Sequence, residues 1–504
     1  MTLPRTSVTH AVLVAALMVV FTARITHVAW TASPTFDEPK HLTTGLAYLA
    51  SGICCLGRDN TPMVAWNALP LYLTGTLPQL TEADEKTLGD DPTAVLRPRY
   101  FAARMMQLPL VWLLCFAVYR WTRTQLGRSG AAIALALLSV EPSVTAFAAL
   151  VSPDFQVAAL LLTTAVAAAP LASQPLAARR VALVGVLAGG ALLAKYTALV
   201  LVPALVLAAL ASRHRRHNLV HACAALAIAA AIVLLAYEVP KLTHGISGLH
   251  APQFADRATQ ARLADLLARA PAADELGYFA GLGEVRRNAM VGFPVYFFGA
   301  LGHRFAAFYP SLLLFKTPVA VLLCVPLGLI CWLRSPHRRG LLVPGLTALL
   351  VLLAAITSHF NLGIRHVLLV APIGSCLAAA ALALAPGHVL AKSALIALAA
   401  LAGYRHHPRH LAYFNELIGG PAHAAEFFAD SSIDWGQDVW LLPRAARAAH
   451  HPADRLPARH RLAGGVRGVR DGPAARRATA GMVCRLAVAP PRPRQAGLRR
   501  LSPR

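Results

Sequence analysis

The stretch LVHACAALAIAAAIVLLAYEV, residues 219–239, has Glu238 as its only ionisable side chain apart from His221, Cys223 and Tyr237. An α-helix rises about 1.5 Å per residue, so roughly 20 apolar residues cross the hydrocarbon core of a bilayer. A segment in lipid must satisfy its backbone polar groups internally, which favours a helix over an open strand. Residues 219–239 are therefore predicted to form a transmembrane helix.

Further apolar runs repeat this pattern along the chain. Hydrophobic residues make up 57% of the 504 residues, against 14% charged. The predicted fold class is an all-α integral membrane protein with about eleven transmembrane helices. The first run, with Arg5 before it, also fits a cleaved signal peptide, and cleavage leaves the sidedness derived below unchanged. The runs are 11–30, 105–120, 130–147, 155–172, 180–194, 196–211, 219–239, 309–333, 341–357, 366–385 and 389–404.

Arginines gather in alternate loops between these runs, which predicts their orientation. Four arginine-containing loops fall on one side: RWTRTQLGR, the loop with Arg179 and Arg180, SRHRRHN and RSPHRRG. Because cytoplasmic loops carry an excess of Lys and Arg, this side is predicted to be cytoplasmic, together with the N-terminus. The outer face then holds 31–104, 148–154, the turn at Lys195, 240–308, 358–366 and everything after 404.

The predicted domain organisation is a polytopic membrane domain over 1–404, with outer loops 31–104 and 240–308. Residues 405–442 begin an outer-face C-terminal region. The tail 443–504 is rich in Arg, Ala and Pro and contains no Phe, Tyr, Trp, Ile, Lys, Asn or Glu. Such a composition cannot bury a core, so the tail is predicted to be disordered. Two hypotheses explain it: a reading frame lost near residue 443, or a genuine basic tail. In the long loop, FADRATQARLADLLARA (254–270) predicts a helix, either solvated or a lid.

The net charge of +24 does not indicate nucleic-acid binding, because the excess lies in the inner loops and the tail. The eight cysteines show no zinc-type spacing. The sequence also lacks a P-loop and a dinucleotide-binding glycine pattern, which disfavours a cytoplasmic nucleotide-sugar substrate.

Acids and bases from separate helices are predicted to meet on the outer face. The segment ASPTFDEPKHLTTG, residues 32–45, places several ionisable groups directly after the first apolar run. Polar groups at membrane depth are costly, so they are functional candidates by default. Their confinement to one side predicts a charged ligand there. They are Asp37, Glu38, His41, Asp154, Lys195, Lys316, Arg365 and His366.

Each of these residues also has an ordinary structural explanation. Asp154 follows Pro153 and fits a helix N-terminal acid. Lys195 and Lys316 fit lysines that snorkel to the membrane interface. Arg365 fits a headgroup anchor, and the two acids at 37 and 38 fit the cap of an interfacial helix.

Two chemistries use such a set of charges. In group transfer from a lipid-linked phosphate donor, cations hold the leaving phosphate while a carboxylate deprotonates the acceptor hydroxyl. Transport predicts ionisable residues near helix centres and internal repeats. The helix centres here are almost purely Ala, Leu and Val, no repeat is found, and the nearest exception, Glu141, precedes Pro142 and suggests a helix end. The pattern therefore favours transfer.

Four segments resemble the GT-C superfamily of membrane glycosyltransferases, in the branch that holds protein O-mannosyltransferases, aminoarabinose transferases and bacterial lipopolysaccharide-core sugar transferases. The segments are FDEPKHLTTGLAYLASG, GFPVYFFGALGHRFAAFYPSLLLFKTPVAVLL, SHFNLGIRHVLLVAP and HLAYFNELIGGPAHAAEFFADSSIDWGQDVWLL. The likeness as a whole covers roughly residues 10–442. The resemblance implies Asp37 as the catalytic base or as an acid that orients the acceptor, with Glu38 beside it as a second catalytic candidate. It implies that Lys195, Lys316 and Arg365 bind the donor phosphate. His41, Asn60, Asp154 and His366 are the candidates for substrate or metal binding.

One segment departs from the branch. Where relatives have an acidic-His-Pro-Pro segment, this chain has RDNTPM, with Asp59, Asn60 and Pro62. Any role of that His in binding an acceptor or a metal is therefore in doubt, although Asn60 retains hydrogen-bonding capacity.

The predicted function is transfer of a hexosyl or pentosyl unit from a polyprenyl-phosphate sugar to a glycan, lipid or protein acceptor. The resemblance implies the bacterial inner membrane, with the active site on the outer face and membrane lipid as a further partner. No cofactor is required by the sequence, and Mg²⁺ or Mn²⁺ stays open. The alternatives are a non-catalytic membrane protein, a lipid-linked sugar transporter on the same scaffold, or a gene product that its tail leaves inactive.

Overall fold

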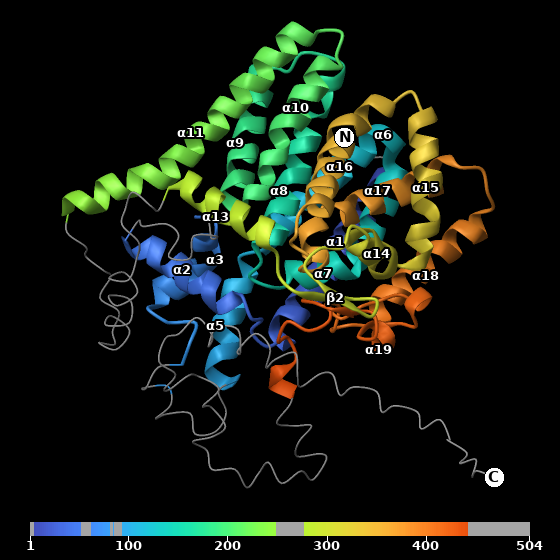
Figure 1. The fold of residues 1–504 in the computed structure, drawn as a ribbon. Coiled ribbons are helices and arrows are strands. Elements are labelled where there is room, and N and C mark those ends of the chain that lie inside the picture. The colour runs from blue at the N-terminus through green and yellow to red at the C-terminus, as the bar shows by residue number, and fades with distance from the viewer. Residues whose placement is uncertain (1–4, 52–61, 81–83, 85–92, 248–276, 442–504) are drawn as a thin grey trace, which may run out of the picture. The chain divides into compact units, whose positions relative to one another are not determined.

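The computed structural model describes residues 5–51, 62–80, 84, 93–247 and 277–441. The predicted helix at 254–270, the candidate Asn60 and the tail 443–504 lie outside these residues. Helices form most of the described chain (Figure 1). In chain order the α-helices are α1 Arg5–Thr31, α2 Glu38–Ser51, α3 Val64–Thr74, α5 Thr93–Met105, α6 Leu108–Val140, α7 Pro142–Ala148, α8 Pro153–Ala168, α9 Ala178–Ala194, α10 Leu201–Leu210, α11 Arg215–Ser247, α13 Tyr278–Val291, α14 Phe308–Lys316, α15 Val319–Arg334, α16 Leu342–Thr357, α17 Val370–Leu384, α18 Val389–Arg405 and α19 Pro421–Ala424.

Short 3₁₀ turns and three strands complete the described elements. The turns are η1 Ala169–Ala172, η2 Tyr196–Val200, η4 Arg338–Leu341, η5 Ile364–Val367, η6 Glu416–Ile418 and η7 Val439–Leu441. The strands, which the sequence did not predict, are β1 Val295–Phe297, β2 Ala300–Gly302 and β3 Phe428–Ala429. They form one antiparallel sheet in the order β2-β1-β3, with Phe297 opposite Phe428. The sheet fastens the loop before α14 to the segment after α19.

Among the described residues, five helical stretches are long and apolar enough to cross a membrane, or six if one bent pair is a single span. The predicted count of about eleven is therefore not confirmed, although all the predicted apolar runs are largely helical. One reason is length: α9, α17 and α18 are each shorter than 18 residues. The five stretches are Val8–Thr31, Thr93–Val140, Pro153–Ala172, Arg215–Val239 and Arg338–Thr357.

Two breaks in the helices follow from local sequence. The helical backbone of α6 is interrupted at Gly127, whose φ of 75° and ψ of −171° lie outside the helical region. Glu141 ends α6 and caps α7, its side chain accepting a hydrogen bond from the backbone N–H of Val144. This confirms the helix end predicted from Glu141 and Pro142.

The predicted run 309–333 is wrong as a single straight helix. The helix axis bends by 112° between α14 and α15. Pro318 has no N–H to continue the helix, so carbonyls of the preceding turn lose their usual partner. Asn415 supplies new ones, because its Nδ2 donates to Leu314 O at 2.7 Å and to Thr317 O at 2.8 Å. The bend places Lys316 at the end of α14.

Helices α15 and α17 pack closely through a small residue. A Cβ added at Gly328 of α15 would lie 1.7 Å from the carbonyl oxygen of Leu377 in α17. Only glycine allows this approach, as is common where helices associate in membranes. The apolar core extends from here through α1, α6 and α8.

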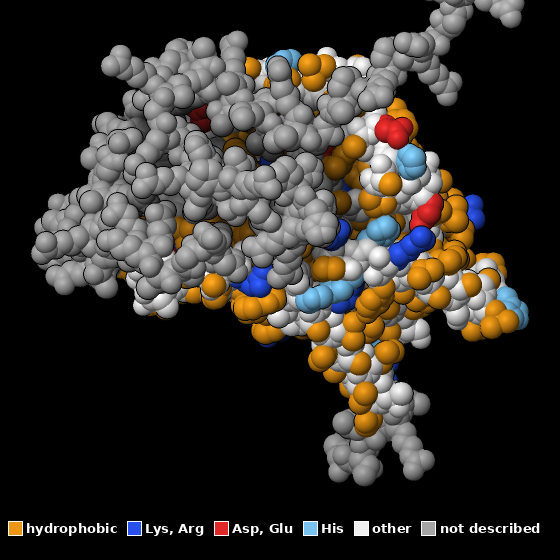
Figure 2. Space-filling model, turned by 90° about the horizontal axis from the view of Figure 1, so that it is seen from below, with side chains coloured by type: hydrophobic (Ala, Val, Ile, Leu, Met, Phe, Trp, Pro, Cys, Tyr) orange, Lys and Arg blue, Asp and Glu red, His pale blue; other side chains and the backbone are white. Residues whose placement is uncertain are grey.

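The loops that carry the predicted site lie at one end of the helices. Helices α2, α3, α5, α13 and α19 and the sheet are all found there (Figure 1). Seen from this end, His, Lys and Arg side chains lie among hydrophobic ones on the part of the surface not drawn in grey (Figure 2).

Candidate active site

Asp37 and Arg365 form an ion pair between two loops that are distant in sequence. Arg365 Nη1 lies 2.8 Å from Asp37 Oδ2, and the two side chains are 11% and 26% exposed. The Arg365 guanidinium lies over the ring of Trp435, 4.3 Å from its centre. This stacking limits the movement of the guanidinium. The structure thus brings together two residues that sequence analysis placed on one face.

Asp154 and Lys195 form a second ion pair. Asp154 lies in the first turn of α8, and Lys195 is the extended residue that ends α9. Both line a small cavity together with Arg365 and His366. Four predicted site residues from three segments therefore meet around one cavity.

The loop that carries Arg365 is held by the segment after α19. Gly363 has a φ of +108°, and a Cβ there would lie 2.7 Å from Ser432 Oγ. The Ser432 hydroxyl accepts a hydrogen bond from Ile364 N at 2.9 Å, and Ser431 donates to the carbonyl of Leu362. A larger residue at position 363 would push these hydroxyls away from the loop.

Glu38 lies beside Asp37 in sequence but in a different environment. Its carboxylate and the Arg104 guanidinium are both fully buried. Arg104 donates to Glu38 Oε1 at 2.8 Å and to Oε2 at 2.6 Å. The carboxylate also accepts hydrogen bonds from the backbone N–H groups of Thr35 and Val151, both at 2.8 Å. These contacts favour a positioning role for Glu38 over the predicted catalytic one.

Lys316 is also buried and does not line the cavity with Lys195 and Arg365. Its Nζ donates to Leu411 O at 2.8 Å and to Ser432 O at 2.7 Å, and it lies 4.4 Å from the centre of the Phe414 ring. These contacts tie α14 to the segment after α18. They favour a structural role over the predicted contact with the donor phosphate.

Asp430 is a site residue that sequence analysis quoted in a motif but did not single out. Burial raises the pKa of its carboxyl, although a hydrogen bond from Ser432 and the charges of Lys316 and Arg365 oppose this. Its carboxylate accepts a hydrogen bond from the backbone N–H of Ser432, the residue that holds the Arg365 loop. Asp430 and Trp435 both lie within the segment FADSSIDW. This motif was therefore the signal in the sequence that could have identified Asp430 as a site residue.

His41 and His366 are the remaining predicted site residues within the described part of the chain. His41 is half-buried in the first turn of α2. The His366 ring stacks on Phe360, with 6.0 Å between ring centres. Within the part of the chain that the structure describes, no group of three or more His, Cys, Asp or Glu side chains could hold a metal ion. Asp37 and Asp154 each pair with a basic side chain.

Comparison with known proteins gives a family match over part of the chain and a similar fold. The dolichyl-phosphate-mannose-protein mannosyltransferase family matches residues 93–238, which include Asp154 and Lys195. Among solved structures, the chain is similar to ArnT from Cupriavidus metallidurans bound to undecaprenyl phosphate. The TM-score is 0.53 at 15% identity, over 83% of this chain and 68% of that one. A search of curated proteins finds no match.

A second structural neighbour is the oligosaccharyltransferase AglB from Archaeoglobus fulgidus, in complex with an inhibitory peptide and a dolichol-phosphate. It has a TM-score of 0.46 and 14% identity, over 84% of this chain and 56% of that one. The family match and the likeness to ArnT confirm the resemblance seen in the motifs: the chain has the fold of the GT-C superfamily of membrane glycosyltransferases.

Proposed function

We propose that the protein transfers a sugar from a polyprenyl-phosphate donor to an acceptor hydroxyl. The observation that carries this proposal is the meeting of two carboxylate–cation pairs, Asp37 with Arg365 and Asp154 with Lys195, beside one cavity. The undecaprenyl phosphate in the ArnT structure supports a lipid-phosphate partner.

Arg365 and Lys195 are the cations we assign to the donor phosphate. Both side chains are partly exposed and reach the same cavity. Charge-assisted hydrogen bonds to phosphate are among the stronger ones in proteins. Asp154 orients Lys195, and the Trp435 ring orients Arg365. The phosphate gains negative charge as the sugar leaves, so fixed cations stabilise that transition state.

Asp37 is the residue we assign as general base. It takes the proton of the acceptor hydroxyl while that oxygen attacks the anomeric carbon of the sugar. The bond between this carbon and the phosphate oxygen breaks, and polyprenyl phosphate leaves with its electron pair. The products are the glycoside, polyprenyl phosphate and a protonated Asp37. Attack opposite to the leaving phosphate inverts the anomeric configuration.

The charge pattern of the loops supports an active site on the outer face of a bacterial inner membrane. The acceptor would then be an outer-face glycan, lipid or protein, and the donor a hexosyl or pentosyl polyprenyl phosphate. A requirement for Mg²⁺ or Mn²⁺ stays an open prediction, tested by adding a chelator to the assay below.

The test uses the full chain in proteoliposomes with a panel of labelled polyprenyl-phosphate sugars. Asp37→Asn should lower turnover at least about 100-fold, the usual contribution of a general base, and still bind donor. The matched control is Asp434→Asn, at an exposed carboxylate that accepts a hydrogen bond from Gly436 N at 2.9 Å, which should keep full turnover. Transport of lipid-linked sugar without transfer, or equal activity of both variants, would contradict the proposal.

A further inference from the structure

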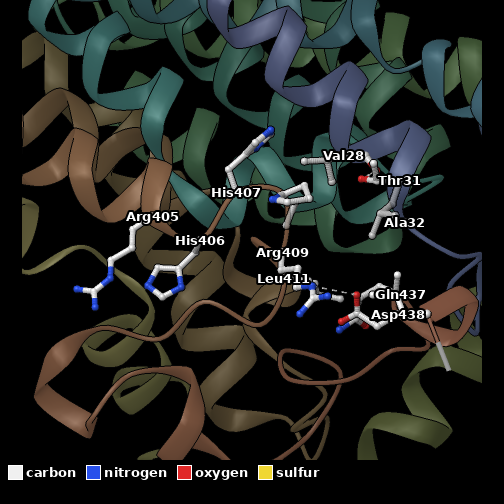
Figure 3. Close-up of a pocket in the computed structure, with 14 residues that line it drawn as sticks. Val28, Thr31, Ala32, Arg405, His406, His407, Arg409, Leu411, Gln437 and Asp438 are labelled. Atoms are coloured by element: carbon white, nitrogen blue, oxygen red, sulfur yellow. Dashed lines mark hydrogen bonds and ion pairs between the residues drawn. The ribbon is translucent and has the colours of Figure 1, made fainter. Parts of the chain in front are cut away.

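A second and larger cavity lies at the same end of the helices. Its volume is about 500 Å³, within the range of small-molecule sites. The end of α1, the segment 405–411 after α18 and the residues just before 442 line it. In Figure 3, Arg405 and His406 lie to one side, Gln437 and Asp438 to the other, and Arg409 between them. It shares no lining residue with the cavity at Asp154 and Lys195.

Positive charge dominates the polar lining of this cavity. It contains Arg405 and Arg409, two histidines, and Asp438 as the one carboxylate. The ion pair from Arg409 Nε to Asp438 Oδ1 is 3.7 Å long, between side chains that are 64% and 43% exposed. Exposed pairs of this kind are weak. No ion pair joins Arg405 to a carboxylate within the residues that the structure describes. An incoming anion can therefore bind Arg405 directly, and it can displace Asp438 from its weak pair with Arg409.

A chain of side chains fixes the inner wall. His407 Nε2 lies 2.6 Å from His27 Nδ1, and His407 Nδ1 lies 3.0 Å from His410 Nε2. His410 in turn lies 3.2 Å from Arg24 Nη2. Burial, with the neighbouring His27 and Arg24, lowers the pKa of His407. His407 is therefore neutral at pH 7, and the two arginines carry the charge of the cavity.

Apart from Thr31 and Gln437, the rest of the lining is apolar. Val28 lies in the last turn of α1, a candidate membrane span, and Ala32 directly follows that helix. Ala146, Leu150 and Leu411 continue the surface. A free anion uses the arginines but gains nothing from these side chains. A ligand with a phosphate group and an adjoining apolar part uses both.

We propose that this cavity binds a phosphate-bearing ligand, with Arg405 and Arg409 holding the phosphate and the apolar wall holding the group attached to it. The source is either the headgroup of an anionic lipid or a soluble phosphate compound. The site is independent of the transfer reaction proposed above, because it uses none of the residues assigned there.

The test measures ligand binding to the full chain in detergent by native mass spectrometry at fixed salt. The probes are short-chain phosphatidic acid, diacylglycerol with the same chains, and inorganic phosphate as a competitor. Phosphatidic acid should bind at least about tenfold more tightly than diacylglycerol. The double variant Arg405→Gln, Arg409→Gln should lose about 25-fold, since each basic residue near a lipid surface contributes about fivefold.

The matched control is the double variant Arg338→Gln, Arg339→Gln, which removes two exposed arginines of η4 and should leave the affinity unchanged. Competition by millimolar phosphate would identify a soluble ligand, and its failure would identify a lipid headgroup. Equal binding of both lipids, or equal losses in the two double variants, would overturn the proposal. Because all four arginines are exposed, the variants should keep the wild-type thermal midpoint.

Discussion

Replacing Arg104 by methionine tests whether the buried pair with Glu38 holds the loop that carries Asp37. Methionine keeps much of the side-chain volume but removes the guanidinium. Besides its two bonds to Glu38, Arg104 donates to the carbonyls of Ala29, Ala32 and Ser33, each at 2.8 Å. These carbonyls lie at and just after the end of α1, so Arg104 also stabilises that helix end.

The expected loss is large because the remaining charge is left buried. Removing one partner of a buried ion pair costs about 3–5 kcal/mol of unfolding free energy. The three carbonyls add to this if water does not reach them, at about 1 kcal/mol or more for each acceptor left unsatisfied. We therefore expect Arg104→Met to lose at least about 3 kcal/mol. By contrast, Arg287→Met breaks the exposed pair with Glu284 and should cost under about 1 kcal/mol.

The assay is reversible unfolding of the full chain in mixed micelles, combined with a double-mutant cycle. Glu38→Gln with Arg104→Met should cost clearly less than the sum of the two single variants, because it leaves no uncompensated charge. Additive costs, or a loss for Arg104→Met no greater than for Arg287→Met, would refute the reasoning. Turnover should fall with stability, since Asp37 directly precedes Glu38.

Three further predictions concern the two cavities. Lys195→Gln should weaken donor binding about tenfold through loss of a charge-assisted hydrogen bond, as measured by native mass spectrometry. Unchanged binding would show that Lys195 does not bind the donor and that Asp154 does not orient it for this purpose. Gly363→Ala should lower the unfolding free energy by about 1–3 kcal/mol through backbone strain and reduce turnover, whereas Gly283→Ala, with open space around its Cβ, should do neither. In the second cavity, burial lowers the pKa of His407, so binding of a phosphodiester lipid should tighten as pH falls below about 6.5. His406 lines the same cavity and its pKa is also lowered by burial, so this dependence should become weaker in His407→Gln but not disappear.

The convergence of the site could be predicted from the sequence because membrane topology restricts where charges can meet. Arginines in alternate loops placed Asp37 and Arg365 on one face, and the structure joins them 2.8 Å apart. The same reasoning placed Asp154 and Lys195 on that face, and the structure joins them in an ion pair. A bilayer reduces the search to two faces, and few ionisable groups share each one.

The roles of neighbouring residues could not be predicted in the same way. Asp37 and Glu38 are adjacent and chemically alike, yet only Glu38 turns inward to Arg104. Nothing in the run RYFAARMM distinguishes Arg104 from an interfacial arginine. Lys316 was expected inside a straight helix, but the bend at Pro318 depends on Asn415, which is distant in sequence. Such choices are made by tertiary contacts that carry no local pattern.

The contact between Asp37 and Arg365 has a consequence for the order of events at the proposed site. Arg365 donates a hydrogen bond to the Asp37 carboxylate, so an acceptor hydroxyl has to compete with the guanidinium for that oxygen. An arriving phosphate competes for the same guanidinium and so loosens its hold on the carboxylate. Binding of the donor phosphate and release of the proposed base are then one step, and a hydroxyl that enters first meets a carboxylate that already accepts a hydrogen bond from Arg365. Donor should therefore bind before acceptor.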